Sequence, residues 1–344
     1  MLQVAILGVG WAGTRHVEAI RELGRKLTVN CLVDHDAAFL ADRAAALDVT
    51  RTYTDYHKAL RDPEVDAVSI CLPHTMHAPV AVEAASAGKH VLCEKPMAMT
   101  VAEATTMIDA TEAHDVTLYV AENASYAASA IRLRDIVASG EHIGELTYAT
   151  LRKGFQAQDY GFTGRRRWLS TPELGGTGTW MLHGIHSMAQ LRFILGEVET
   201  VYVQQHRASS FRREDLEGTM SGLLTLDRGV HVAVVQTPES RIPHPLRGYT
   251  LFGDKGVIQA GQDAMQVFSE ALDAKDSGVT FKYPEASLST YAQEMESFAD
   301  TVAGVAVGPT TGRSERRSLA IVQAGYESAA SGEPVNLKAR FGPL

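Results

Sequence analysis

The chain has 344 residues, of which 45% are hydrophobic and 21% are charged, and its formal net charge at pH 7 is −9. This composition is typical of a folded protein of two domains rather than of a disordered chain. No run of basic residues is long enough to form a cationic stripe, which argues against nucleic acid or an anionic membrane surface as a partner. No run of about eighteen apolar residues predicts a membrane span.

The chain starts with an apolar segment, residues 1–7, that runs directly into a glycine turn. It lacks the positive stretch and the cleavage site of a signal peptide, so we expect a first strand and a cytoplasmic protein. The three cysteines, Cys31, Cys71 and Cys93, each lie in an apolar run. This favours buried, reduced thiols over a disulfide framework.

Up to about residue 121, short apolar runs alternate with longer amphipathic stretches, as in repeated βα units with a parallel sheet. Apolar residues recur at helical spacing between residues 38 and 47 and between residues 80 and 85. We therefore predict a doubly wound α/β domain over residues 1–121. Its strands are expected at residues 4–7, 27–33, 67–72, 90–93 and 117–121.

After residue 121 the apolar runs follow one another with turns and few intervening helices. Residues 227–229 and 253–256 are hairpin-type connections, which predicts a mostly antiparallel sheet in a second, α+β domain over residues 122–344. Its strands are expected at residues 198–203, 222–226, 230–235, 249–252 and 257–260. Helices are expected at residues 131–139, 181–195, 291–302 and 313–331.

A glycine-rich turn follows the first strand directly and opens a helix. In its sequence, Gly8-Val9-Gly10-Trp11-Ala12-Gly13, the first glycine allows a tight turn, the second lets the backbone approach a pyrophosphate, and the third lets the helix pack on the strand. The N-terminus of the helix adds N–H groups and a positive dipole end. We therefore predict a dinucleotide site; the alternative is a tight turn without a ligand.

The second strand ends in Val33-Asp34, where a carboxylate can accept hydrogen bonds from the ribose hydroxyls of a dinucleotide. A carboxylate there would repel a 2′-phosphate, and the next residue is His35 rather than arginine. NAD is therefore expected rather than NADP. In the alternative without a nucleotide, Asp34 caps the next helix.

Two further strand tips should border the nicotinamide half of the cofactor, because ligands of doubly wound sheets lie outside the carboxyl ends of the strands. One tip carries Cys71, Leu72, Pro73 and His74, and the other carries Glu94-Lys95-Pro96. Oxidising an alcohol requires removal of its hydroxyl proton, and a lysine beside a cationic ring would have a lowered pKa. A stiff or cis Lys95–Pro96 bond could hold that side chain; an ordinary surface lysine before a loop proline is the alternative.

At these motifs the sequence resembles a known family, the Gfo/Idh/MocA oxidoreductases. The resemblance rests on segments at residues 62–68, 77–78, 87–91, 94–96, 320–322, 326–329 and 332–335. It implies an N-terminal Rossmann domain, a C-terminal domain with a large open sheet, and association into dimers or tetramers through that sheet. It also implies a nicotinamide cofactor, hydride transfer on sugars, cyclitols, sugar acids or dihydrodiols, and a Lys95 that reaches substrate beside the nicotinamide.

The stretch from Gly175 to His186 resembles the family's glycine-rich entry to the helix that faces the nicotinamide. His186 matches the motif histidine that exchanges a proton with the substrate, while a histidine that only packs in the helix is the alternative. Many members carry an aspartate four residues earlier, where this chain has Leu182. His183 lies on nearly the same predicted helical face and could take part of that role at the substrate.

Further residues are candidates for the two sites. Arg166 and Trp168, in the Arg165-Arg166-Arg167-Trp168 segment, could bind substrate or could belong to an exposed loop. Asn123 and Tyr126 begin the second domain, where family members contact cofactor or substrate, and turn and packing roles are the alternative.

The pairs His74/His77 and His183/His186 have a spacing that can chelate a metal, but no carboxylate or cysteine accompanies either pair at ligand spacing. We therefore expect no metal, and we expect His74 and His77 to line the cofactor groove.

Three functions remain open from the sequence. The first is an NAD-dependent dehydrogenase or reductase of a polyhydroxylated or cyclic alcohol, with Lys95 and His186 handling the proton. The second is an NAD-binding sensor without turnover, suggested by Leu182. The third is an enzyme that uses tightly held NAD for transient oxidation.

Overall fold

The computed structural model describes residues 1–156, 163–171, 174–175, 178–213, 216–243 and 246–344. The contacts divide these residues into two compact units. The first unit contains residues 1–123 and 287–317 together with Leu174 and Gly175, and the second contains the remaining described residues. Residues 287–317 lie within the range predicted for the second domain, but their contacts group them with the first unit.

The first unit contains a sheet of six parallel strands in the order β3-β2-β1-β4-β5-β6. This is the doubly wound arrangement expected from the alternating pattern. The two-residue strand β3 was not predicted, because it is too short to leave a pattern. The strands are β1 (Leu2–Leu7), β2 (Leu27–Val33), β3 (Thr52–Tyr53), β4 (Ala67–Ile70), β5 (His90–Glu94) and β6 (Leu118–Ala121).

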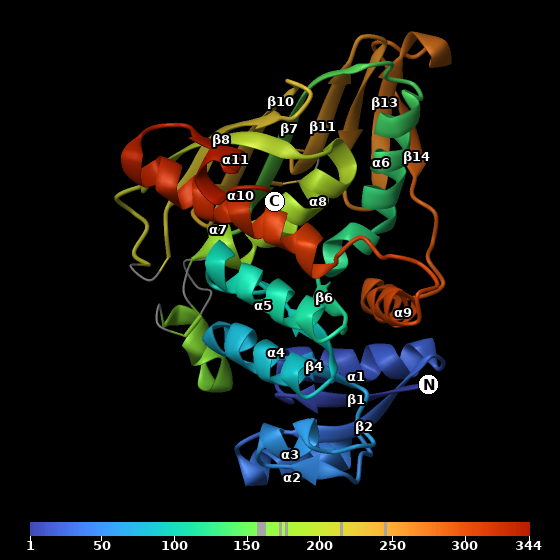
Figure 1. Cartoon of the computed structure of the whole chain (residues 1–344). Coiled ribbons are helices and arrows are strands. Elements are labelled where there is room, and N and C mark those ends of the chain that lie inside the picture. Colours follow the sequence, from blue (N-terminus) through green and yellow to red (C-terminus); the bar gives the residue numbers. More distant parts are fainter. Residues whose placement is uncertain (157–162, 172–173, 176–177, 214–215, 244–245) are drawn as a thin grey trace. The chain divides into compact units, whose positions relative to one another are not determined.

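Five helices connect these strands, and the sixth, α9 (Thr290–Val302), comes from far along the chain to pack on the first one (Figure 1). Met295 and Phe298 of α9 are fully buried and join the same apolar cluster as Ile20. At the edge of this contact, Lys26 Nζ lies 2.8 Å from Asp300 Oδ1. The connecting helices are α1 (Trp11–Leu23), α2 (Ala37–Ala46), α3 (Tyr56–Leu60), α4 (His77–Ser86) and α5 (Val101–Ala113).

The second unit contains a nine-stranded sheet in the order β14-β13-β12-β11-β7-β10-β9-β8-β15. Only β7 and β10 pair in parallel, so the sheet is mostly antiparallel, as predicted. Strands β7, β13, β14 and β15 were not predicted. The strands are β7 (Leu146–Gly154), β8 (Val198–His206), β9 (Thr219–Leu226), β10 (His231–Thr237), β11 (Gly248–Gly253), β12 (Gly256–Ala260), β13 (Ala264–Ser269), β14 (Val279–Lys282) and β15 (Val335–Asn336).

Helices of the second unit pack on one face of this sheet (Figure 1). The fully buried Trp180 anchors them, because its Nε1 donates to Val322 O of α10 at 3.0 Å. The single helix predicted over residues 181–195 is instead two helices that break at His183. The helices are α6 (Ala128–Ser139), α7 (Thr179–Leu182), α8 (Gly184–Leu195), α11 (Leu337–Phe341) and the part of α10 (Gly312–Ser331) from Ser318 on.

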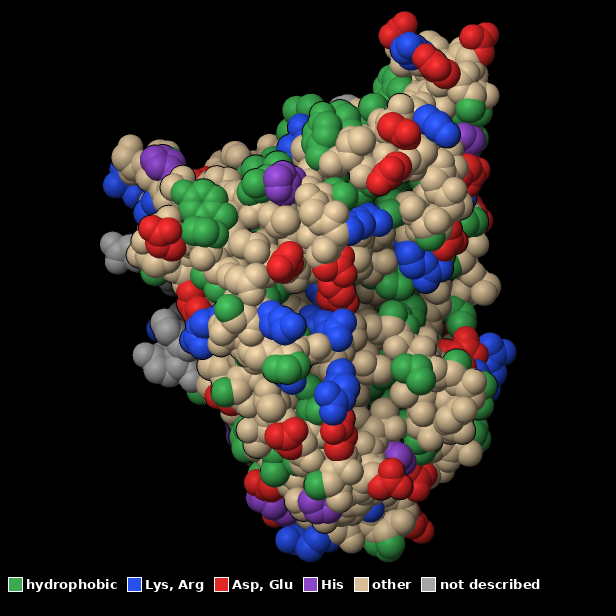
Figure 2. Space-filling view, turned by 45° about the horizontal axis from the view of Figure 1, so that its top comes forward, with side chains coloured by type: hydrophobic (Ala, Val, Ile, Leu, Met, Phe, Trp, Pro, Cys, Tyr) green, Lys and Arg blue, Asp and Glu red, His purple; other side chains and the backbone are tan. Residues whose placement is uncertain are grey.

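Acidic and basic side chains are interspersed over the face of the molecule seen in Figure 2. Within the described ranges, no helix combines the length and the apolar character needed to cross a bilayer.

Candidate functional site

In the glycine turn after β1, the surrounding backbone requires glycine at two of the three positions. Gly8 has φ 90°, and a Cβ atom there would lie 2.4 Å from the carbonyl oxygen of Cys71. A Cβ atom on Gly13 would lie 2.0 Å from the carbonyl oxygen of Gly8. Both positions therefore exclude any larger side chain.

Gly10 differs from the other two glycines. A Cβ atom there would meet no protein atom within 4 Å, and its φ of −67° is open to any residue. No described atom near this Cβ position requires glycine there, so the residue leaves open space for a bound group. Gly10 is also the N-cap of α1, whose first turn has no side-chain cap and no acidic residue. The turn thus fits a pyrophosphate on the N-terminus of the helix.

Asp34 follows β2 and is 6% exposed. Its carboxylate accepts hydrogen bonds from the N–H of Val9 at 3.4 Å and from that of Asp36 at 3.1 Å. The N-cap of α2 is Asp36, which accepts from Phe39 N. The alternative in which Asp34 caps this helix is therefore wrong, and Asp34 instead joins the glycine turn to the end of β2. The neighbouring His35 is exposed.

The tip of β4 is held against the glycine turn and against a second loop. Cys71 N donates to Leu7 O at 2.8 Å, and the partly exposed Cys71, Leu72 and Pro73 follow the strand. His77 is fully buried, and its two ring nitrogens lie 2.9 Å from the carbonyl oxygens of Leu72 and Pro96. His77 therefore links the loops after β4 and β5.

His74 is 4% exposed, and its Nδ1 lies 2.8 Å from Gly175 O. Burial, with a smaller contribution from His77, lowers the pKa of His74 to about 3, so the ring is neutral. Its Nδ1 donates to that carbonyl. Among the residues whose placement is described, no group of three or more His, Cys, Asp and Glu side chains is arranged to hold a metal ion.

The tip of β5 carries the second candidate motif. The Lys95–Pro96 bond is cis, as the sequence suggested. Glu94 Oε2 accepts from Lys95 N at 3.0 Å, and Glu94 Oε1 lies 3.2 Å from Nε2 of the fully buried His16. His16 Nδ1 in turn lies 2.7 Å from Ser69 Oγ. A histidine of α1 thus connects β4 to the backbone of Lys95.

His16 is a residue of this cluster that the sequence patterns did not predict. The one available signal was a histidine on the otherwise apolar face of α1 that carries Val17, Ile20 and Leu23. Burial alone would lower the pKa of His16, but Cys71 and Glu94 together raise it well above its usual value. The imidazolium form therefore pairs with the carboxylate of Glu94.

A further acid lies in this cluster. Glu294 of α9 is fully buried, and neither of its carboxyl oxygens has a hydrogen-bond partner in the described part of the chain. Burial raises its pKa well above the usual range, and the nearby Glu94 and Glu122 add to the effect while His16 opposes it. The protonated form of Glu294 is therefore favoured in the folded protein.

We expect Glu294→Gln to stabilise the protein increasingly as the pH rises. Above pH 4.5 the unfolded chain ionises Glu294, so folding must take up a proton, which costs about 1.4 kcal/mol per pH unit until the raised folded-state pKa is reached. Glutamine does not have this cost. Urea unfolding at pH 5 and pH 8 should show a larger gain at pH 8.

Glu296→Gln on the same helix is the matched control. Hydrogen bonding to Lys26 lowers the pKa of Glu296, so its contribution is present above pH 4.5 and its loss should destabilise slightly at neutral pH. A gain for Glu294→Gln that did not depend on pH would contradict the protonated state.

The candidate residues of the second unit lie around the break between α7 and α8. His183 is the N-cap of α8, and its ring centroid lies 4.8 Å from that of Phe155. The break takes it out of the continuous helix assumed for the His183/His186 pair. His186 is partly buried in the first turn of α8. Leu182 is 8% exposed and packs with Leu169, which explains why an apolar residue occupies this position.

The four remaining candidate residues differ in how far they are buried and in what they contact. Trp168 packs against the Leu169–Leu182 cluster, and Arg166 is exposed in the 3₁₀ segment Gly164–Ser170. Asn123 Nδ2 donates to Thr290 Oγ1 at 3.1 Å within the first unit, and Tyr126 is 7% exposed in the second. Their roles toward cofactor or substrate stay predictions.

Comparisons with known proteins agree with this architecture. The family model described as "Oxidoreductase family, NAD-binding Rossmann fold" matches residues 2–122. A second model, "Oxidoreductase family, C-terminal alpha/beta domain", matches residues 137–337.

Individual proteins match over most of their length. The chain is 24% identical to the myo-inositol 2-dehydrogenase of Thermotoga maritima over 99% of this chain and 100% of the relative. It is 27% identical to the NADP(+) D-xylose 1-dehydrogenase of Haloarcula marismortui, over 87% of this chain and 82% of the relative.

A solved structure shares the fold. The crystal structure of an oxidoreductase from Agrobacterium radiobacter, in complex with NAD+, L-tartaric acid and magnesium, has a TM-score of 0.84 at 23% identity and covers 98% of this chain and 99% of its own. With both family models matched in order along the sequence, the chain belongs to the Gfo/Idh/MocA family of oxidoreductases.

Proposed function

We propose that this protein is a dehydrogenase or reductase that uses a nicotinamide dinucleotide and acts on a CH–OH or carbonyl group of a sugar, cyclitol, sugar acid or dihydrodiol. The observation that carries the proposal is the space beside Gly10 at the uncapped N-terminus of α1, which fits a pyrophosphate. Family membership and the inositol and xylose dehydrogenases among the relatives support the substrate class.

In this proposal Gly8, Gly10, Trp11, Ala12 and Gly13 hold the pyrophosphate, and Asp34 accepts from the adenosine ribose. When bound, the nicotinamide takes hydride from the substrate carbon or returns it. NAD is the proposed cofactor, because the nearly buried Asp34 carboxylate would meet a 2′-phosphate. A relative that uses NADP makes the comparison of both cofactors part of the test.

Lys95 is the proposed proton acceptor for the substrate hydroxyl during oxidation, and the proton donor in the reverse direction. Its backbone is fixed by Glu94, which His16 holds in place. His186 is proposed to hydrogen-bond the reacting oxygen. Since position 182 is an apolar residue packed on Leu169, no carboxylate at that position can orient the histidine.

The test is a screen of the purified protein with NAD and, separately, NADP against sugars, cyclitols, sugar acids and dihydrodiols. Absorbance at about 340 nm follows the reduced cofactor, and mass spectrometry follows the product. Reduction of NAD with one substrate class supports the proposal. Tight nucleotide binding without reduction or product would favour the sensor, and product without net reduction would favour transient oxidation.

The three cysteines are free thiols, which supports a reducing compartment such as the cytoplasm for this enzyme. Cys31 and Cys93 are buried as expected, whereas Cys71 is partly exposed at the tip of β4.

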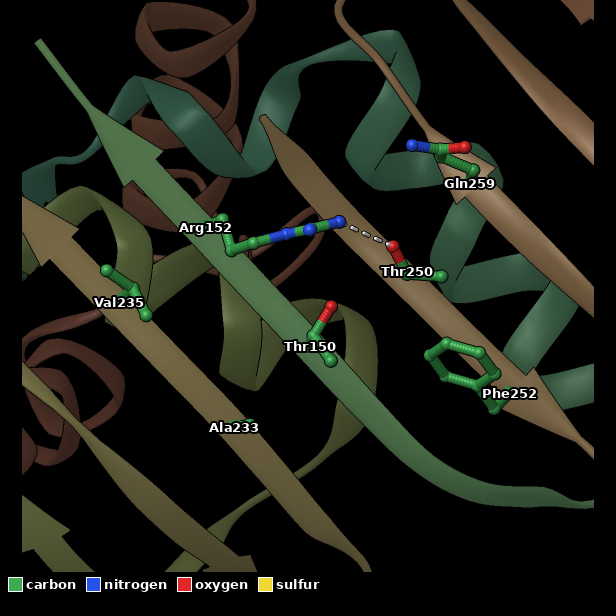
Figure 3. A pocket seen from close by; sticks show the side chains of 7 residues that line it. All are labelled: Thr150, Arg152, Ala233, Val235, Thr250, Phe252 and Gln259. Atoms are coloured by element: carbon green, nitrogen blue, oxygen red, sulfur yellow. Dashed lines mark hydrogen bonds between the residues drawn. The ribbon is translucent and has the colours of Figure 1, made fainter. Parts of the chain in front are cut away.

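We also propose that the enzyme is a homodimer or homotetramer formed through one face of the nine-stranded sheet. On this face Tyr148 and Leu223 are 46% and 39% exposed, and the Tyr148 ring stacks on Phe252 with centroids 4.1 Å apart. The face also has a hollow of about 340 Å³ (Figure 3). Its lining residues come from four strands: Thr150, Arg152, Ala233, Val235, Thr250, Phe252 and Gln259.

Tyr148→Glu is expected to weaken self-association by at least about tenfold, because a buried carboxylate at an apolar contact is costly. Light scattering across a concentration series measures the assembly size. Val305→Glu, which changes a 73% exposed side chain after α9, is the control and should leave the size unchanged. An unchanged assembly in Tyr148→Glu would place the contact elsewhere.

A further inference from the structure

Lys153 is the penultimate residue of β7. Side chains alternate along a strand, and Figure 3 shows Thr150 and Arg152 pointing to the same face of the sheet. Leu151 and Lys153 therefore belong to the other face, and Leu151 is 1% exposed there.

Helix α8 packs on this second face. Gln236, the residue of β10 that pairs with Lys153, is 3% exposed and accepts from Ser187 Oγ of α8 at 3.3 Å. Tyr249 of β11 donates from its hydroxyl to Ser187 O at 3.5 Å. Lys153 thus lies on the helix-covered face, where β7 and its parallel partner β10 both end.

The same end of β7 leads to the break between α7 and α8. Phe155 follows Lys153 by two residues, its N–H donates to Thr237 O at the end of β10, and its ring contacts His183. Lys153 therefore belongs to the same part of the second unit as the candidate substrate histidine.

No described residue balances the charge of Lys153. Among the described residues, its ammonium group has no hydrogen bond and no ion pair, although the side chain is only partly exposed. Burial lowers its pKa, and the one charged neighbour that contributes is another cation, Arg247. Gly248, the first residue of β11, pairs with Arg152, which puts the preceding residue, Arg247, beside Lys153.

Two neighbouring cations to which the described part of the chain brings no carboxylate are unfavourable in a partly buried place. A bound anion would remove this cost. Arg247 Nη2 already donates to Gln262 Oε1 at 3.0 Å. Of the two cations, Lys153 is therefore the one that receives no hydrogen-bond partner from the described residues.

We propose that Lys153 binds an acidic group of the substrate, a carboxylate or a phosphate, and thereby selects sugar acids or sugar phosphates over neutral sugars and polyols. This inference rests on the proposed function for its catalytic readout. Lysine suits the role because its ammonium is a compact charge with three donors on a flexible stem.

The experiment compares D-glucose, D-gluconate and D-glucose 6-phosphate, first by calorimetric binding to the protein with its cofactor and then in the reduction assay. Wild type should bind at least one of the acidic compounds about tenfold more tightly than glucose. Lys153→Met should abolish that preference and raise KM for the acidic compound, with kcat changed less. Lys153→Arg should restore part of it, and Lys282→Met on the exposed end of β14 should match wild type.

Comparing the binding of D-gluconate with that of D-glucose 6-phosphate shows whether the protein recognises a carboxylate or a phosphate. Equal binding of glucose and both acids by wild type would overturn the inference, and so would an equal loss of neutral and acidic binding in Lys153→Met. Binding of an acid that depends on Lys153, without cofactor reduction in any assay, would uphold the inference and reject the dehydrogenase.

Discussion

Lys95→Met is expected to lower kcat by about 10²- to 10⁴-fold, the usual contribution of a positioned general acid or base. Methionine keeps most of the length of the side chain and removes the amine, so the substrate hydroxyl loses its proton acceptor. The backbone N–H of residue 95 can still donate to Glu94, because the substitution changes only the side chain. Steady-state kinetics on the substrate found in the screen measures the effect, and fluorescence titration with NADH should give an unchanged Kd.

Lys58→Met provides the control for this prediction, since Lys58 is exposed on α3 in the same unit. It should leave kcat unchanged. Full turnover in Lys95→Met would show that another group exchanges the proton. A rise in KM with unchanged kcat would instead show that Lys95 only binds substrate.

Gly10→Ala is expected to weaken binding of the dinucleotide by at least about 100-fold, or about 2.7 kcal/mol, without a loss of stability. The added methyl group meets no protein atom within 4 Å, and the backbone at Gly10 has an ordinary negative φ. The methyl group would occupy the space from which the pyrophosphate approaches the N-terminus of α1. Calorimetric titration with NAD gives the Kd, and thermal unfolding of the protein without cofactor gives the stability.

Gly13→Ala is the comparison variant, because the fold requires glycine at position 13 but not at position 10. Its methyl group would lie 2.0 Å from Gly8 O, so we expect a loss of about 3 kcal/mol or more even without cofactor. Similar stability losses in both variants would mean that Gly10 also serves the fold. Normal NAD binding by Gly10→Ala would mean that the dinucleotide does not approach this turn.

Local patterns in the sequence were sufficient for much of the first unit. The alternation of apolar runs and helical stretches predicted five of its six parallel strands, and the glycine spacing predicted the turn before α1. Strand β3 was not predicted, because two residues are too few to show a periodic pattern of apolar residues. Strand β7 was not predicted for another reason: threonine, lysine and arginine interrupt its apolar positions.

The sequence also named the residues at the strand tips, including Asp34, Lys95 and the cis Lys95–Pro96 bond. It could not name His16, because the reason for a buried histidine in α1 is a carboxylate 78 residues away on β5. Nor could it anticipate the break at His183, since residues 181–195 carry a continuous helical period.

The sequence by itself determined the order of the elements, the class of both sheets and the glycine turn for a dinucleotide, because these depend on periodicity and on the conformational freedom of single residues. The tertiary structure decided which distant residues meet. It brought Glu294 of α9 to His16 and placed Lys153 opposite a second cation. Such contacts depend on how helices and strands pack, and one sequence carries no local signal of them.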